Sequence, residues 1–215
     1  MEKQLRKIRR YLGIINEARI MNFRALDGIT ILPCTYKEGS ALPPLDNFKP
    51  YTAGDIWGDG WDSHAWFHFT FTVPEEMRGK TTELVLRTDI TNGWDANNPQ
   101  FMAYINGKLR QGMDTNHLYV TLDNDTYDYC YVYGYTGAKI EKTRFFAELR
   151  NRDDAAEQLY YDIRTPLEML DYLDRNSSEY ANIVKYLDAA VSRLELYEVG
   201  SDEFRESIKD AAQFM

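Results

Sequence analysis

The clearest pattern in the sequence is an alternation of side-chain types over residues 64–73, HAWFHFTFTV. The odd positions are all apolar, and the even positions are His64, Trp66, His68, Thr70 and Thr72. A period of two is typical of a β-strand whose two faces meet different surroundings. Pro74 ends the run, because proline cannot donate a hydrogen bond to a strand ladder. We predict a strand whose even positions form an outward face, covered by a helix or by another domain.

Short runs of similar character continue to residue 149, with turn residues between them. They predict strands at residues 81–89, 101–105, 108–112, 117–122, 127–135 and 142–149. Asn106-Gly107 predicts a two-residue type I′ turn, since both central positions of that turn need a positive φ. Gly112 predicts a bend or bulge in the strand that follows. About seven strands with one apolar face each indicate an antiparallel β-sandwich, of a jelly-roll or galactose-binding-like type.

Helical spacing dominates the two ends of the chain. Residues 2–24 predict a helix, with an apolar stripe of Leu5, Ile8, Leu12, Ile15 and Ala18. Residues 151–215 predict about three helices, the first with a stripe of Leu159, Ile163, Leu167, Leu170 and Leu173. Pro166 should kink that helix. Asn176 and Glu179 resemble a capping box for the second, and Ser201 after Gly200 begins the third.

Three domains follow from these patterns. They are an N-terminal amphipathic helix at 1–24, a β-sandwich at 25–150, and a helical segment at 151–215. Within the second, residues 25–62 contain four prolines and predict a meandering, ordered loop. The apolar end of the chain at Phe214 and Met215 suggests a sequence cut from a longer one.

The charge distribution excludes some partners and leaves others open. The net charge of −9 does not suit a nucleic-acid binder, which needs a basic surface. Residues 1–24 hold seven basic and two acidic side chains, and residues 151–215 hold seven basic and fifteen acidic ones. The two ends are expected to lie against each other or against another domain. A basic amphipathic helix also suits a membrane surface, but the narrow apolar face favours a docked helix.

Candidate chemistry is sparse. His64 and His68 lie about 13 Å apart on a strand, which is too far for one zinc ion. Asp123, Asp125 and Asp128 are clustered oxygen donors that suit calcium, although their spacing is better explained by a polar turn. Cys34 and Cys130 form no metal or redox motif and are expected to be free, buried thiols. Without a signal peptide or an apolar span of about 18 residues, we expect a soluble, cytoplasmic protein.

The sequence also resembles a known enzyme family. The segments WFHFTFTVPEEMRGK (66–80), LVLRTD (84–89) and YINGKLRQGMDTNHLYVTL (104–122) are similar to the N-terminal region of glycoside hydrolase family 38 α-mannosidases. The likeness covers about residues 57–198, and QGMDTNH is its most specific part. The resemblance implies an enzyme that removes terminal α-linked mannose. It also implies that the catalytic residues and a divalent metal, usually zinc, belong to a separate catalytic domain that begins with a His-x-Asp motif.

This chain contains no His-x-Asp metal motif, so no catalytic or metal-binding residue is assigned to it. We predict a structural, substrate-shaping domain whose partners are that catalytic domain and mannose-containing oligosaccharides. The alternatives are a free-standing carbohydrate-binding module and a β-sandwich that mediates homo-oligomer contacts. The candidates for carbohydrate or domain contact are Trp66, Trp94, Asp95, Asp114 and His117. Asp114 and Asn116 equally suit bonds to nearby backbone in a turn.

Overall fold

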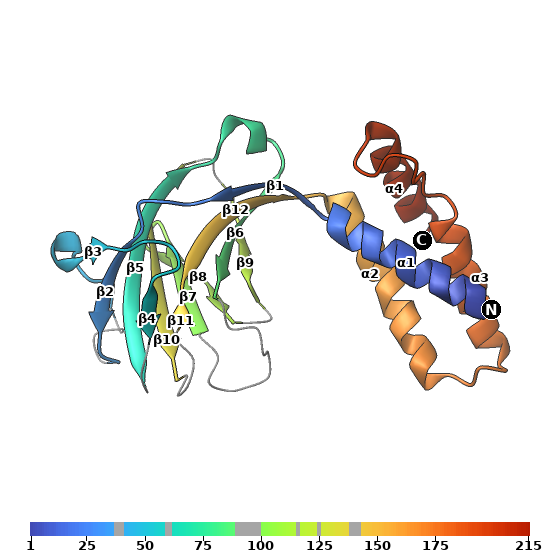
Figure 1. Cartoon of the computed structure of the whole chain (residues 1–215), viewed down its shortest axis with the longest axis horizontal. Helices are drawn as coiled ribbons and strands as arrows, with labels where there is room; N and C mark the ends of the chain where they lie inside the picture. The colour runs from blue at the N-terminus through green and yellow to red at the C-terminus, as the bar shows by residue number, and fades with distance from the viewer. Residues whose placement is uncertain (37–40, 59–61, 89–99, 115–116, 124–125, 138–142) are drawn as a thin grey trace. The chain divides into compact units, whose positions relative to one another are not determined.

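The computed structural model describes residues 1–215 except 37–40, 59–61, 89–99, 115–116, 124–125 and 138–142, and it describes residues 126–128 by their backbone alone. The described residues form two compact units. One unit, Asn22–Asn151, contains the β-sandwich, and the other joins Met1–Met21 to Arg152–Met215 and is helical (Figure 1). The helix that begins the chain therefore belongs to the same unit as the helices that end it.

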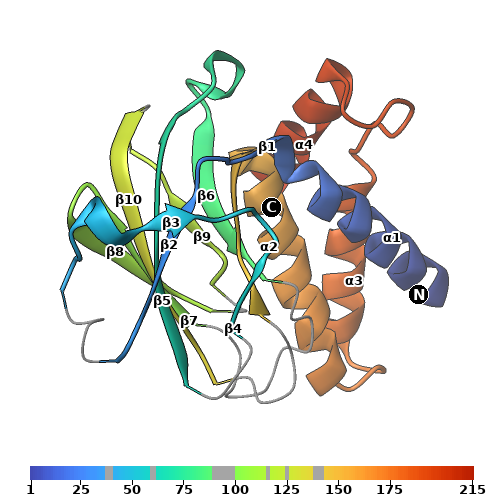
Figure 2. The same ribbon diagram turned by 60° about the vertical axis from the view of Figure 1, so that its left-hand side comes forward.

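The larger sheet of the sandwich has six strands (Figure 2). Their order is β3 (Lys49–Pro50), β2 (Thr30–Cys34), β5 (Ser63–Thr72), β10 (Thr126–Thr136), β7 (Gln100–Ile105) and β8 (Lys108–Met113). β10 pairs antiparallel with β5 on one side and with β7 on the other, and β7 pairs antiparallel with β8. The long alternating strand predicted at residues 64–73 is thus confirmed as β5, next to the centre of this sheet.

The smaller sheet has four strands. Their order is β1 (Ile20–Ala25), β12 (Phe146–Arg152), β6 (Thr81–Arg87) and β9 (Tyr119–Thr121), and a two-stranded ladder of β11 (Thr143–Arg144) and β4 (Ile56–Gly58) accompanies them. One apolar cluster is shared by both sheets, with Phe67 from β5, Leu84 from β6 and Ala147 from β12. The predicted β-sandwich with a helix before it and helices after it is confirmed.

The hairpin of β7 and β8 forms as predicted at its turn. Asn106 has φ 47° and Gly107 has φ 76°, which are the positive values that a type I′ turn requires. A bulge does occur in β8, but it lies at Arg110, because Ala103 pairs with Gln111 and Tyr104 pairs with Leu109. Gly112 itself pairs regularly with Met102.

Two predictions along the first third of the chain are wrong. The N-terminal helix α1 spans Glu2–Ala18 and not 2–24, because residues 20–25 form strand β1 beside β12. Residues 25–62 are not wholly a loop, since they contain β2, β3 and β4. Pro33 is tolerated in β2 because β3 pairs only with Thr30 and Ile31, which leaves Pro33 at an edge.

The helical unit contains α1, α2 (Asp154–Met169), α3 (Ser178–Val191) and α4 (Asp202–Phe214). The predicted stripes form its core, which includes Ile8, Leu159, Val184 and Phe204. The oppositely charged ends do meet, since Lys7 Nζ lies 2.9 Å from Asp188 Oδ1. Among the described residues, no helix is both long and apolar enough to cross a membrane.

Side-chain caps fix where these helices begin. Ser201 accepts a hydrogen bond from the Phe204 amide, as predicted for α4. The cap of α3 is Ser177 and not Asn176, since the Ser177 hydroxyl accepts from the Tyr180 amide. The next residue in the chain therefore takes the role that the capping-box pattern gave to Asn176.

Candidate functional site

The candidate site lies on the face of the six-stranded sheet that points away from the shared core, called here the outer face. Cross-strand pairing places aromatic side chains of β5 and β10 in register, with Trp66 opposite Tyr133 and His64 opposite Tyr135. β7 continues these rows with Met102 opposite Tyr133 and Gln100 opposite Tyr135. Alternation along three strands therefore brings residues from three distant segments onto one surface.

The outer face of β5 is covered by aromatic side chains from the segment between β2 and β3, where the sequence predicted a helix or a separate domain. Phe48 packs edge-on against His68, with the ring centroids 5.9 Å apart, and Tyr36 lies 6.0 Å from His64. Trp66 is only 1% exposed, beneath Tyr131, Tyr133 and Tyr104. Trp66 is consequently a supporting residue that holds these rings, and a ligand cannot stack on it.

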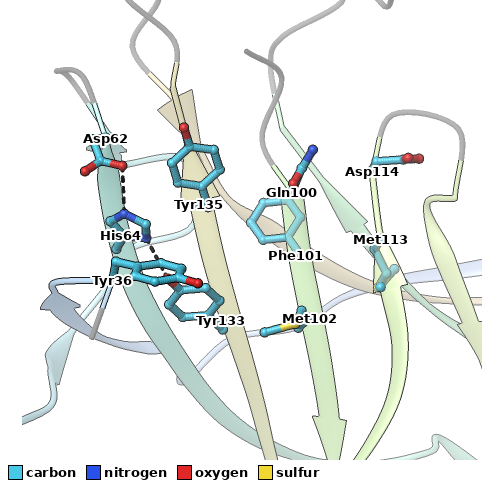
Figure 3. Close-up of a pocket in the computed structure, with 11 residues that line it drawn as sticks. Tyr36, Asp62, His64, Gln100, Phe101, Met102, Met113, Asp114, Tyr133 and Tyr135 are labelled. Carbon is cyan, nitrogen blue, oxygen red and sulfur yellow. Dashed lines mark hydrogen bonds and ion pairs between the residues drawn. The ribbon is translucent and has the colours of Figure 1, made fainter. Parts of the chain in front are cut away.

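A cavity of about 740 Å³ opens at one end of the outer face (Figure 3). It is lined by Tyr36, Asp62, His64, Gln100, Phe101, Met102, Gly112, Met113, Asp114, Tyr133 and Tyr135. Figure 3 shows Asp62 and His64 at one side and Asp114 at the other, with Tyr135, Gln100 and Phe101 between them. The described lining contains two carboxylates and no lysine or arginine.

One wall of the cavity is a hydrogen-bonded chain of three side chains. His64 Nε2 lies 3.0 Å from Asp62 Oδ1, and His64 Nδ1 lies 2.6 Å from the Tyr133 hydroxyl. A carboxylate only accepts, so Nε2 donates to Asp62, and when the imidazole is neutral its Nδ1 accepts the Tyr133 proton. His64 is 7% exposed, whereas the Asp62 side chain is 74% exposed. The chain therefore links a buried ring to an accessible carboxylate.

Burial also sets the protonation of this wall. It raises the pKa of Tyr133 to about 12, with smaller contributions from neighbouring groups that include Cys34 and Asp62. The phenol consequently keeps its proton at neutral pH and donates it to His64. The lone pairs of the Tyr133 oxygen remain available as acceptors beside the exposed carboxylate of Asp62.

The opposite wall is the end of β8. Asp114 Oδ1 accepts from the His117 amide at 2.8 Å and lies 3.0 Å from His117 Nδ1. The backbones of the same two residues also bond to each other in both directions. Asp114 thus closes a tight turn through its own side chain, as the turn interpretation predicted, and it does so at the rim of the cavity.

The structure places the predicted site residues differently relative to the cavity. Asp114 lines the cavity, His117 contacts Asp114 without lining it, and Trp66 lies buried beneath. Trp94 and Asp95 lie outside the described residues, as does Asn116. Sequence reasoning missed Asp62, His64 and Tyr133 as one group. The available signal was alternation, since His64 had been placed on the outward face and every second residue of the run from Tyr131 to Tyr135 is tyrosine.

No metal centre is found in the part of the chain that the structure describes, where no three histidine, cysteine or acidic residues come together. Asp123 pairs with Arg110 at 2.9 Å, while Asp125 lies outside the described residues and only the backbone of Asp128 is described. Cys34 and Cys130 are both free, as expected, although only Cys130 is fully buried. Burial raises the pKa of the Cys130 thiol to about 12.

The two carboxylates of the cavity do not form a hydrolytic pair. Asp62 precedes β5 and Asp114 follows β8, and β10 and β7 lie between these strands. Three strand spacings of about 4.8 Å separate them by about 14 Å. Glycosidases that use two carboxylates hold them about 5–9.5 Å apart. The geometry therefore suits binding of a ligand and does not suit cleavage of a glycosidic bond by this pair.

No protein-family model and no curated protein matches the chain. Solved structures do match, among them the β-glucuronidase from Ruminococcus gnavus in complex with D-glucaro 1,5-lactone, with 15% identity, a TM-score of 0.36 and coverage of 60% of this chain and 29% of that one. The structure of the same enzyme without a named ligand has 13% sequence identity and a TM-score of 0.35. That match covers 60% of this chain and 29% of the enzyme chain. These neighbours are glycoside hydrolases, and the chain spans less than a third of their length. At such TM-scores the likeness does not assign the chain to a family.

Proposed function

We propose that this chain is the non-catalytic N-terminal part of an α-mannosidase, in which the β-sandwich has a structural and substrate-shaping role. The observation that carries the proposal is the segment YINGKLRQGMDTNH, which resembles the α-mannosidase segment and forms the β7–β8 hairpin beside the cavity. The residues by which this segment resembles the family form the turn of the hairpin and the end of β8.

Several of the described residues of the segment have a local role. Asn106 and Gly107 supply the positive φ values of the turn. Gln111 Nε2 donates to the Tyr119 carbonyl at 3.0 Å, which ties β8 to β9. Asp114 caps the following turn and faces the cavity. These roles support a domain that shapes a surface, because the residues that resemble the family hold the hairpin and the cavity rim in place.

The free thiols of Cys34 and Cys130 support a reducing compartment, and we propose a cytoplasmic location on that ground. The divalent metal that the resemblance implies would be held by the catalytic domain, since the described residues of this chain offer no cluster of ligands for it.

A hydrolysis assay tests the non-catalytic role. The 215-residue chain is incubated with p-nitrophenyl α-D-mannopyranoside and Zn²⁺ or Co²⁺, and we expect no release of nitrophenol above the protein-free rate. The Asp62→Asn/Asp114→Asn double variant is the control for contaminating enzyme. Metal-dependent hydrolysis by the chain that this variant loses would overturn the proposal, whereas equal hydrolysis by both proteins identifies a contaminant.

A second test concerns the α-mannosidase assignment. The coding sequence that follows codon 215 is read in the same frame. A His-x-Asp motif at the start of an α/β domain is the expected result, and a downstream sequence that encodes an unrelated domain would contradict the assignment.

The cavity favours a second candidate function, a carbohydrate-binding module that acts on its own. It is concave, it belongs to one compact unit, and it combines aromatic side chains with a few fixed polar groups. Binding of mannose-containing oligosaccharides without any catalytic domain would favour this candidate.

A further inference from the structure

The charge of the cavity restricts what it can bind. Asp62 and Asp114 contribute two carboxylates, and no described lining residue is a lysine or an arginine. An anionic ligand would bring a third negative charge next to these carboxylates, and the described lining has no lysine or arginine to offset it. Uronic acids and phosphorylated sugars are therefore poor ligands, although a β-glucuronidase is among the solved structures that resemble the chain.

The polar wall offers acceptors in fixed positions. Asp62 Oδ1 accepts from His64, and among the described residues Asp62 Oδ2 has no bond that would occupy it. When the His64 imidazole is neutral, the Tyr133 proton is directed at Nδ1, and the phenol oxygen is then an acceptor for a ligand. Both groups are held by a buried ring, which lowers the entropy lost when a ligand binds. A ligand with adjacent hydroxyl donors satisfies both acceptors.

The remaining lining suits the less polar face of such a ligand. Tyr135 stands between the polar wall and Gln100, and Met102 lies on the same face (Figure 3). Phe101, whose ring belongs to the sandwich core, reaches the cavity from below. Aromatic and apolar groups with a few polar groups at one side are the usual composition of a small-ligand pocket, and about 740 Å³ lies within the usual range of about 300–1,000 Å³. A pyranose presents C–H groups on its faces and hydroxyls at its edge.

Gly112 keeps the cavity open on the β8 side. A Cβ built on this residue meets no atom within 4 Å, although the residue lies in a strand and lines the cavity. Its φ is not in the left-handed region, so a side chain there is not strained by the backbone. A larger residue at position 112 would occupy cavity volume and leave the sandwich core unchanged.

From these observations we propose that the cavity on the outer face binds an uncharged pyranose, with the sugar hydroxyls on Asp62 and Tyr133 and the ring beside Tyr135, and that it discriminates against uronic acids. The inference deepens the carbohydrate-related function proposed above and rests on it. Asp62 and Tyr133 are the specificity-determining residues, and His64 is a positioning residue that acts through them.

Calorimetric titration of the 215-residue chain tests the site. Methyl α-D-mannopyranoside should bind with a dissociation constant on the order of 1 mM, and D-glucuronic acid should bind at least about tenfold more weakly. Gly112→Val should abolish measurable binding, and Asp62→Asn and Tyr133→Phe should each weaken it about tenfold. Leu109→Val is the matched control, because Leu109 is exposed on the outer side of the same strand and does not line the cavity.

The outcomes separate the site from the broader function. Mannoside binding that Gly112→Val leaves unchanged would overturn the site while leaving a carbohydrate-related role intact. Glucuronic acid binding as tightly as the mannoside would overturn the proposed ligand class. Absence of binding to either sugar would overturn this inference and count against the carbohydrate-binding module. It would leave the non-catalytic role untouched, because that role is decided by the hydrolysis assay. Thermal unfolding of each variant confirms that a lost signal is not a lost fold.

Discussion

The two outer faces of the sandwich treat their acidic side chains in opposite ways. On the four-stranded sheet, Glu83 is 0% exposed, and its Oε2 atom lies 2.7 Å from Arg150 Nε. The buried Glu148 forms an ion pair with Arg87. On the six-stranded sheet, Asp62 is exposed at a cavity whose described lining has no lysine or arginine, and its described partner is the His64 ring. One face buries its carboxylates and pairs them with guanidinium groups, and the other leaves its carboxylates accessible. The difference suggests that the first face is closed for stability and the second is kept open for a ligand.

Replacing Arg150 with alanine tests the closed face and should have the largest effect. Glu83 would lose its guanidinium partner while remaining buried, which typically costs on the order of 3 kcal/mol of unfolding free energy. The guanidinium also lies 4.7 Å from the centre of the Tyr119 ring, so its removal costs packing as well. Urea unfolding followed by circular dichroism measures the change.

Two further variants make this result specific. Arg110→Ala removes an exposed ion pair with Asp123 and should cost less than about 1 kcal/mol. The double variant Glu83→Leu/Arg150→Leu removes both charges and should recover most of the lost stability. If Arg150→Ala costs no more than Arg110→Ala, the closed face is not held by its ion pairs.

A pair of glycines compares the packed side of the six-stranded sheet with the open one. A Cβ on Gly134 would lie 3.1 Å from the Phe101 ring and 3.2 Å from the Trp57 ring, whereas one on Gly112 meets nothing. Gly134→Ala should therefore cost about 1–3 kcal/mol through overpacking. Gly112→Ala should be neutral or stabilising by up to about 1 kcal/mol. Equal effects in chemical denaturation would show that the cavity side is as tightly packed as the core.

Removing the hydroxyl of Tyr133 should cause the smallest change in unfolding free energy among these tests. Tyr133→Phe removes its bond to His64 and should cost about 1 kcal/mol at neutral pH. Because burial raises the pKa of Tyr133 from about 10 to about 12, the folded state holds this proton more tightly than the unfolded state. That stabilisation is complete below pH 10 and is lost as the pH rises to about 12.

The pH dependence separates Tyr133 from other groups. The buried thiol of Cys130 contributes a loss of the same sign, since its pKa is also raised to about 12. Tyr133→Phe should therefore reduce the fall in unfolding free energy between pH 10 and 12 without abolishing it. Tyr172→Phe is the control, because Tyr172 is 91% exposed and lies in the helical unit. An unchanged slope in Tyr133→Phe would contradict the assignment of the buried phenol.

Local features of the fold could be read from the sequence because short-range physics determines them. The alternation around Phe67 predicts β5, Asn106-Gly107 predicts the turn, and Ser201 predicts the start of α4. The end of α1 and the strand that contains Pro33 could not be read in this way. Both depend on pairing with distant strands, which overrides local preference.

The candidate site depends almost entirely on such distant pairing. His64 was assigned to an outward face, yet its partner Tyr133 is 69 residues away and Asp114 comes from a third segment. Alternation gives the face of a residue but not the order of the strands or their register. Asp114 was proposed because of the family resemblance, whereas nothing in the sequence distinguishes Asp62 from the many other acidic residues of the chain.

The pairing of His64 with Tyr133 also has a kinetic consequence. It closes a loop of 69 residues, and contacts over such distances make a sandwich fold slowly, in about milliseconds to seconds. Isolated helical turns form in about microseconds or less. During refolding, the ability to bind a ligand should therefore appear with the late docking of β10 onto β5, well after the helical signal. The time at which ligand binding appears during refolding would therefore measure when β10 docks onto β5.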